Sequence, residues 1–335
     1  MSGFTARRIG EPVGAILLEN AESGARVMVL ASLGATLWTL RLPVQADRDG
    51  RRGHAGSAAE ILEGDHGVEE LQENPGFRGR ILTPFNDRIP QGRYRFNGAS
   101  YELPANDPTD GSAIHGLVYK RVFDVCELSA DFRSAEVKLQ TVVGDDEYAG
   151  YPFAIRVSVA YRLDAFGLRT TIAVKNESSS PAPVSMGMHP YFLLDSAVGD
   201  TTLYCPGDAY VEVDGQLLPT GAHVPIQGSC FDYTAPSALS TPLDIAIRRE
   251  HSPSALTVID RCNDRLVVEQ NNAPFGYTQL FVPDSATSLA VEPVSAATNA
   301  FNMPELGLSV LAPGAMLSGA MRFSRISRSV SIEGR

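Results

Sequence analysis

The sequence predicts an all-β protein of sandwich or barrel type, and three observations support this. Helical periodicity is not sustained anywhere along the 335 residues. Short runs rich in β-branched and aromatic residues recur from end to end, with Gly, Pro, Asn and Asp between them. Within several runs apolar and polar residues alternate, so one face of each strand should be buried and the other wet. We therefore expect antiparallel sheets.

The expected strands follow one another along the chain. The run ARVMVLASLGATLWTLRLP (Ala25–Pro43) predicts a pair of strands. A polar, Gly- and Ala-rich excursion follows over residues 45–74, in which AAEILEG (58–64) suggests a short helix. The segment GRYRFNGASYEL (92–103) predicts a β-hairpin, because Asn97-Gly98 is a strong turn signal. Further strands are expected at 135–144, 153–164 and 168–178.

The organisation expected for the chain is one contiguous β domain over residues 1–330. Strand signals continue on both sides of every Pro/Gly cluster, and no internal repeat or low-complexity tract divides them. The chain exceeds the usual single-domain size, but all-β sandwiches and barrels often run well past the average without splitting. The closing letters SIEGR (331–335) look like an engineered protease-cleavage linker of the factor Xa type, with a native tail as the alternative, so they are left out of the fold prediction.

Charge and cysteine content limit the partners and the location. The chain has 28 Lys and Arg against 39 Asp and Glu, and the net charge of −11 argues against nucleic acids and anionic membranes. A small neutral ligand fits better. The four cysteines lie far apart without a CxxC pair, and neither a secretory signal nor an 18-residue apolar run is present, so we expect a cytoplasmic protein. A monomer or homodimer is expected.

Three proton-handling side chains stand beside Gly, Pro or aromatic residues that would constrain a pocket wall. They are His115 in GSAIHGL, His189 in GMHPYF and Glu292 in LAVEPVSAATNAFN. A lone core histidine is more often a satisfied structural residue than a functional one, and a carboxylate at the end of a buried strand usually pairs or is solvated. Each signal is weak by itself, so the case depends on their occurring together.

Arg88 in NDRIP is a fourth candidate. An average arginine is a surface cation, but this one lies in a Pro-flanked, aromatic-bounded loop just before the expected hairpin. The planar fork of an arginine presents several fixed donors, which suits sugar hydroxyls.

Taken together, these segments resemble the aldose 1-epimerase, or galactose mutarotase, family. The resemblance covers nearly the whole chain in order: LGATLWTLRLP, the NDRIPQGRY block, the His115-Gly116 pair, GDDEYAGYPFAIRVSVAY, HPYF and the late Glu292-Pro293 before SAATNAFN. It implies a large antiparallel β-supersandwich and an enzyme that interconverts the anomers of a free hexose without cofactor or metal.

The resemblance also implies a role for each matching residue. His189 would be the general acid that protonates the ring oxygen, and Glu292 would be the general base that takes the proton from the anomeric hydroxyl. His115 would hold the sugar near its ring oxygen, and Arg88 would bind hydroxyl groups.

A substrate-binding aspartate is also expected beyond the midpoint of the chain. Asp244 in TPLDIAIRR is the preferred match, and Asp232 in CFDYTAP is its competitor.

The proposed chemistry is also sensible without the family. Interconverting anomers requires ring opening, so one proton must leave the C1 hydroxyl while another reaches the ring oxygen. One base and one acid suffice. The chain departs from the galactose enzymes proper at Leu117, at Met188 and in PVSAATNAFN after Glu292, which leaves the preferred aldose open between glucose, galactose and other sugars.

Three alternatives remain at this point. A hexose-6-phosphate mutarotase would need further cations, for which Arg78, Arg80, Arg93 and Lys120 are candidates. A non-catalytic sugar-binding protein would not need both the acid and the base. The third alternative is a metal site of two histidines and Glu292 on a cupin-like barrel, but 74 residues separate His115 from His189 and cupin ligands usually cluster closely.

Overall fold

The computed structural model describes residues 3–10, 14–45, 57–74, 76–249, 251–252 and 255–329. The SIEGR segment lies outside these residues. Every pairing between its named strands is antiparallel. The predicted all-β architecture is therefore confirmed. Among the described residues, no helix has both the length and the apolar character needed to cross a membrane.

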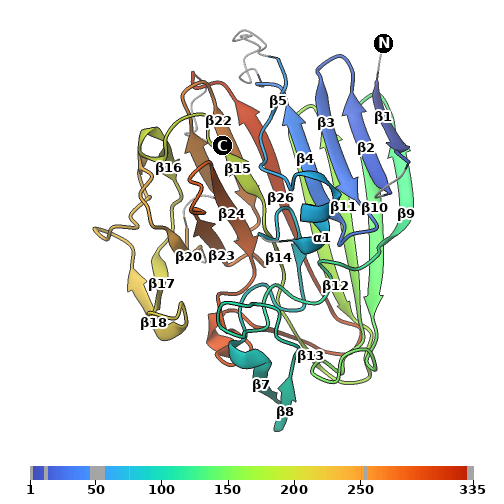
Figure 1. The fold of residues 1–335 in the computed structure, drawn as a ribbon, viewed down its shortest axis with the longest axis vertical. Coiled ribbons are helices and arrows are strands. Elements are labelled where there is room, and N and C mark those ends of the chain that lie inside the picture. Colours follow the sequence, from blue (N-terminus) through green and yellow to red (C-terminus); the bar gives the residue numbers. More distant parts are fainter. Residues whose placement is uncertain are drawn as a thin grey trace.

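Three large sheets make up most of the molecule (Figure 1). The first follows chain order: β1 (Phe4–Arg8), β2 (Ala15–Asn20), β3 (Ala25–Leu30), β4 (Thr36–Leu42) and β5 (Ala59–Glu60). The second has the order β19 (Ser237–Ala238), β16 (Thr202–Tyr204), β21 (Leu256–Asp260), β22 (Arg265–Gln270), β26 (Met316–Ile326), β12 (Gly167–Asn176), β11 (Ile155–Asp164), β10 (Ser134–Val143) and β9 (Asp124–Ala130).

The third large sheet carries most of the candidate site. Its order is β18 (Pro219–Pro225), β17 (Ala209–Val213), β20 (Asp244–Arg248), β23 (Tyr277–Phe281), β24 (Ser288–Val294), β14 (Gly187–Met188) and β6 (Ile81–Leu82), and β15 (Tyr191–Leu193) also pairs with β24. Two small sheets complete the set: β7 (Arg93–Phe96) with β8 (Ala99–Glu102), and β13 (Ala182–Val184) with β25 (Ser309–Leu311).

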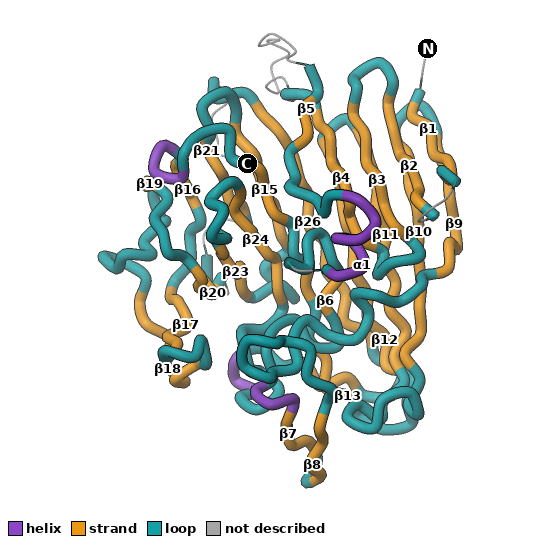
Figure 2. The backbone as a smooth tube through the Cα atoms, viewed as in Figure 1, coloured by secondary structure: helices purple, strands orange, loops and turns teal. Residues whose placement is uncertain are grey.

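Helical structure is short in the described part of the chain. It consists of α1 (Gly67–Glu73) and the 3₁₀ turns η1 (Pro90–Gly92), η2 (Val198–Asp200) and η3 (Pro304–Leu306). Figure 2 shows loops gathered below β6, beside the β7–β8 hairpin. These loops carry several of the candidate residues.

Strand alternation creates the core between the layers. Along β11 and β12, side chains switch between buried and partly exposed at nearly every step, as the period of a pleated strand requires. The strands β1 and β2 pack on β9 and β10, and one apolar cluster joins Val27 of the first sheet to Val137, Val157 and Phe323 of the second. The burial of this apolar surface is the main favourable term for the fold.

The predicted hairpin at 92–103 is confirmed, whereas the predicted helix at 58–64 is wrong. In the hairpin, Asn97 and Gly98 both have positive φ, as the expected tight turn requires. In AAEILEG, Ala59 and Glu60 instead form the edge strand β5 on β4. Ile61 and Leu62 are buried, and contacts from distant strands outweigh the weak local helix preference.

Candidate active site

One face of the third large sheet presents a row of polar and aromatic side chains. In the antiparallel register, Gln279 lies opposite Glu292, and Asp244 lies opposite Phe281. Opposed residues point to the same face of a sheet, and so do residues two apart on one strand. All four side chains therefore face one way. Tyr191 joins them, because it pairs with Ala290, which lies two residues before Glu292.

These side chains form one wall of a cavity of about 520 Å³. The opposite wall comes from loops and supplies Phe77, Arg88, Asp107 and His115, among others. The five residues predicted to act on substrate all line this cavity: Arg88, His115, His189, Asp244 and Glu292. Asp232 does not line it, because its carboxylate accepts hydrogen bonds from Gly228 and Thr234 in a surface turn.

Glu292 and His189 lie in direct contact. The distance from His189 Nε2 to Glu292 Oε1 is 3.4 Å, and both side chains are almost fully buried. Burial raises the pKa of Glu292 well above its usual value, and the nearby Asp87 and Asp244 add to the effect. Burial lowers the pKa of His189 far below its usual value, and His115, Arg78 and Arg88 act in the same direction. Without substrate, the pair therefore favours a neutral imidazole beside a protonated carboxyl group.

His115 is held in one tautomer by the backbone. Its Nδ1 lies 2.9 Å from the carbonyl oxygen of Asn86, which can only accept, so Nδ1 carries the proton and donates. Burial also lowers the pKa of His115. The neutral ring is left with an unprotonated Nε2, which can accept a hydrogen bond from a hydroxyl group.

The loop that carries Arg88 is anchored to the segment after β24. Asn86 donates from Nδ2 to the carbonyl oxygen of Ala296 at 2.7 Å, and Asp87 accepts from the Thr298 hydroxyl at 2.5 Å. The carbonyl oxygen of Arg88 accepts from the amide of Asn299 at 2.9 Å. The SAATN residues therefore position the arginine loop.

Carboxylates surround the Arg88 guanidinium. Its Nε lies 3.3 Å from Asp107 and 3.9 Å from Asp110, and Nη1 lies 3.7 Å from Asp87. Burial acts to lower the pKa of Arg88, but Asp87, Asp244 and further acidic neighbours raise it on balance. The guanidinium is therefore permanently charged, and its charge is largely balanced before any ligand arrives.

The carboxyl group of Asp244 titrates close to neutral pH. Burial and the neighbouring Asp87 raise its pKa to about 6, although Arg88 and a hydrogen bond from Gln279 oppose the change. Gln279 Nε2 donates to Asp244 Oδ1 at 2.6 Å. A carboxylate held in this way can accept hydrogen bonds from a polyhydroxylated ligand.

Sequence reasoning missed several lining residues, notably Asp107, Gln279 and Phe77. Tyr191 and Asp87 lie inside the quoted motifs HPYF and NDRIP, so their closeness in sequence to His189 and Arg88 could have indicated them. Gln279 could be found only from the strand register, because nothing in YTQLF marks it. Two expected determinants of sugar specificity are not in the cavity wall: Met188 is buried in the core, and Leu117 is not a lining residue.

The four cations considered for a phosphate group do not line the cavity. Arg80 is fully buried, where it bonds to Asn74, Thr36 and the carbonyl oxygen of Leu71. Arg78 pairs with three carboxylates, and Lys120 lies over the Tyr119 ring.

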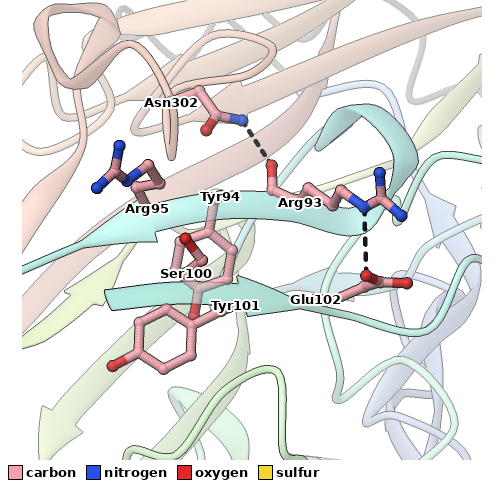
Figure 3. Close-up of a pocket in the computed structure, with 7 residues that line it drawn as sticks. All are labelled: Arg93, Tyr94, Arg95, Ser100, Tyr101, Glu102 and Asn302. Carbon is pink, nitrogen blue, oxygen red and sulfur yellow. Dashed lines mark hydrogen bonds and ion pairs between the residues drawn. The ribbon is translucent and has the colours of Figure 1, made fainter. Parts of the chain in front are cut away.

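Arg93 lies at a separate hollow of about 340 Å³ on the β7–β8 hairpin. Figure 3 shows its guanidinium turned toward Glu102, while Asn302 donates to its carbonyl oxygen. Among the residues that line the main cavity, Arg88 therefore supplies the positive charge. Within the described residues, no group of three His, Cys, Asp or Glu side chains has the spacing to hold a metal ion.

Comparison with known proteins assigns the chain to a family. The sequence profile of aldose 1-epimerase matches residues 19–324. The chain belongs to the aldose 1-epimerase family. Its similarity extends to YihR of Escherichia coli, an uncharacterized protein, with 31% identity over 261 residues that cover 74% of this chain and 80% of YihR.

Two further relatives, whose names state an activity, match a smaller share of the chain. Galactose mutarotase of Rattus norvegicus is 31% identical over 220 residues, which are 64% of this chain and 59% of that enzyme. Aldose 1-epimerase of Escherichia coli is 27% identical over 236 residues, which are 69% of this chain and 63% of that enzyme.

Solved structures share the fold along almost the whole chain. A galactose mutarotase-like protein from Clostridium acetobutylicum matches with a TM-score of 0.81 and 19% identity, covering 97% of this chain and 99% of that one. Galactose 1-epimerase from Lactobacillus acidophilus matches with a TM-score of 0.77 and 19% identity, covering 98% and 99%. At this identity the likeness establishes the galactose mutarotase-like fold.

Proposed function

We propose that this protein is a mutarotase that interconverts the α and β anomers of a free hexose such as glucose or galactose. The observation that carries the proposal is the contact between His189 Nε2 and Glu292 Oε1, 3.4 Å apart on the wall of a cavity of about 520 Å³. Membership of the aldose 1-epimerase family supports the reaction class.

The geometry suits ring opening because the two reacting oxygens of an aldopyranose share one carbon. The ring oxygen and the anomeric hydroxyl both bond to C1, so they lie closer together than the partners of a normal hydrogen bond. An acid and a base that almost touch can reach both at once. Each positioned proton-transfer group contributes about 10²–10⁴ in rate, and this chemistry needs no cofactor.

We assign the proton-transfer steps as follows. The neutral pair becomes a carboxylate facing an imidazolium when one proton moves from Glu292 to His189, across the 3.4 Å contact. Glu292 then takes the proton of the anomeric hydroxyl, and His189 delivers its own proton to the ring oxygen as the C1–O5 bond breaks. Rotation about C1–C2 and closure on the other face reverse both transfers and regenerate the carboxylate–imidazolium pair. The proton on His189 then returns to Glu292, which restores the neutral pair.

Three further side chains would hold the sugar. Arg88 can donate to hydroxyl groups, Asp244 can accept from them, and His115 Nε2 can accept from a hydroxyl near the ring oxygen. These roles are proposals that rest on the shared cavity.

Charge in the cavity favours a neutral hexose over a hexose phosphate. The lining carboxyl groups are Asp87, Asp107, Asp244, Asp284 and Glu292. The Arg88 guanidinium is already balanced by acidic neighbours. A phosphate dianion would therefore enter an acidic cavity without a free cation among the lining residues, and like charges repel it.

Polarimetry tests this proposal. Fresh α-D-glucose, α-D-galactose and α-D-glucose 6-phosphate should be followed with and without the protein. We expect faster decay of rotation for at least one neutral hexose and a much smaller effect on the phosphate. If the protein binds these hexoses but accelerates none, it is a sugar-binding protein and the mutarotase proposal is wrong.

Glu292→Gln tests the assigned base. The amide keeps the shape of the carboxyl group but cannot accept the proton, so we expect catalysed mutarotation to fall by about 10²–10⁴-fold. Glu127→Gln is the matched control, because Glu127 is an exposed carboxylate on β9 paired with Lys138. A Glu292→Gln variant with the wild-type rate would remove Glu292 from the mechanism.

We further propose that residues 1–330 form one domain that works in the cytoplasm. The apolar cluster that joins Val27 to Phe323 supports a single core. Four cysteines without disulfides, three of them exposed, suit a reducing compartment.

A further inference from the structure

The imidazole of His189 lacks the hydrogen bond to a second residue that usually orients a catalytic histidine. Its Nδ1 is buried, and no other residue in the described part of the chain offers it a hydrogen-bond partner; the backbone of His189 itself acts to raise the pKa of the ring. In enzymes that use histidine as an acid or base, the second ring nitrogen typically bonds a carboxylate or carbonyl that fixes the ring. Something other than a hydrogen bond from Nδ1 to a second residue must therefore set the plane of this ring.

Two neighbouring aromatic rings contact the imidazole of His189 and hold its plane. The Tyr191 ring stacks on the imidazole with centroids 4.7 Å apart and planes only 3° from parallel. The His115 ring meets it edge-on, with centroids 5.2 Å apart and planes at 80°. The stack follows from the local sequence, because residues two apart in an extended segment point to the same side. A rotation of the imidazole would break both contacts.

The Tyr191 ring is itself held firmly. Its backbone pairs with Ala290 of β24, and the Phe281 ring contacts it edge-on with a centroid distance of 6.3 Å. The Arg78 guanidinium lies over the ring, 5.6 Å from its centroid. Burial is the main reason that the pKa of Tyr191 is raised above its ordinary value, so the phenol stays neutral.

Arg78 is in turn fixed by acidic side chains. It pairs with Asp65 at 3.2 Å, Glu70 at 3.3 Å and Glu63 at 3.4 Å. Its side chain is mostly buried, and it is not among the residues that line the cavity. The guanidinium therefore supports the Tyr191 ring instead of reaching for substrate.

We propose that Tyr191 is a positioning residue that fixes the plane of His189, so that Nε2 faces Glu292 and the substrate, with Arg78 locking the tyrosine in place. The inference rests on the proposed mutarotase function. A stack orients the ring without a carboxylate at Nδ1. A carboxylate there would stabilise the imidazolium, so the ring without one releases its proton more readily.

Three variants test the proposal by polarimetry. Tyr191→Leu removes the stack, and a misaligned proton donor should lower kcat on the order of 10- to 100-fold while KM changes by only about two- to threefold. Tyr191→Phe keeps the ring and should retain kcat within about twofold. Phe192→Leu is the matched control on the same strand, because its ring faces the core against Phe323. It should lower Tm and leave kcat of the folded enzyme unchanged.

The pH profile adds a readout that general destabilisation would not move. In Tyr191→Leu, water enters beside the imidazole, so the acid limb assigned to His189 should shift upward toward an ordinary histidine value of about 6.5. The charged and titratable groups near the ring are Glu292, Arg78, Arg88 and His115, and all stay in place in each variant. Tyr191→Phe should keep the wild-type profile.

Several results would overturn the inference. Wild-type kcat and pH profile in Tyr191→Leu would show that the stack does not position His189, and a Tyr191→Phe variant as poor as the leucine would assign the effect to the hydroxyl group. If Tyr191→Leu does not fold, histidine-selective NMR of Tyr191→Met should show the His189 resonances losing their ring-current shift; an unchanged shift contradicts the stack. A wild-type protein without mutarotase activity would overturn both this inference and the proposed function.

Discussion

Arg88 lines the cavity, and most of the charge on its guanidinium is already balanced by nearby carboxylates. Asp107, Asp110 and Asp87 lie 3.3, 3.9 and 3.7 Å from its guanidinium nitrogens. This arrangement holds the planar fork in one orientation and leaves it to act through directed hydrogen bonds rather than long-range attraction. It supports the proposal that the site takes a neutral polyol rather than an anion.

Arg88→Ala should therefore raise KM about tenfold, which corresponds to about 1.4 kcal/mol of lost binding, and change kcat by much less. Arg88→Lys is the matched comparison, because it keeps the charge but lacks the planar fork, and its KM should lie between those of the wild type and the alanine variant. Steady-state polarimetry measures both constants. An unaltered KM in Arg88→Ala would exclude Arg88 from substrate binding.

At the scale of the element, the loop that presents His115 depends on a close backbone contact. His115 and Gly116 both have positive φ, and a Cβ at Gly116 would lie 2.1 Å from the carbonyl oxygen of Thr83. Leu117 also donates to that oxygen at 2.8 Å. The glycine lets the loop lie directly against Thr83, the residue that follows β6, which brings His115 to the cavity wall.

Gly116→Ala should displace this loop and lower both stability and activity. Gly111→Ala is the matched control, because Gly111 also has positive φ but has nothing within 4 Å of the added Cβ. We expect Gly116→Ala to cost about 2–4 kcal/mol more than Gly111→Ala, which carries backbone strain alone. Thermal unfolding and polarimetry measure the two effects. Equal costs would contradict the close contact.

At the scale of the whole molecule, ionising the buried carboxyl groups of the site lowers the stability of the fold. The apolar core favours folding, while Glu292 and Asp244 are carboxyl groups whose burial raises their pKa values. Such groups bind protons more tightly in the folded state, and this tighter binding stabilises the fold. The stabilisation is complete below the pKa of the unfolded state and disappears as the pH rises through the pKa of the folded state.

Asp244→Asn should therefore stabilise the protein at pH 8 but not at pH 4. The pKa of Asp244 rises from 3.8 to about 6 on folding, so its ionisation above pH 6 costs about 1–3 kcal/mol that asparagine avoids. Substrate binding should weaken at the same time. Urea unfolding at both pH values measures the change, and an equal effect at pH 4 and pH 8 would contradict it.

Asp232→Asn supplies the control of opposite sign. Hydrogen bonds from Thr234 and Gly228 lower the pKa of Asp232, so its contribution to stability is present above the unfolded pKa and lost as the pH falls through the folded pKa. This substitution should destabilise at pH 8 and have less effect at low pH.

By itself the sequence determined the all-β class and the hairpin at Asn97-Gly98. With the family resemblance it also supplied five candidate residues that turned out to line one cavity, although it left Asp232 as a competitor to Asp244. Alternation and turn chemistry act over a few residues, so they can be read locally. The chemical roles of the five residues stay predictions.

Only the tertiary structure decided how the site is assembled. It made AAEILEG an edge strand, chose Asp244 over Asp232 as a lining residue and brought Gln279 opposite Glu292. It also stacked Tyr191 on His189 and anchored the Arg88 loop to residues more than 200 positions away. Strand register and contacts between distant segments create these arrangements, and no local pattern specifies which distant segments will meet.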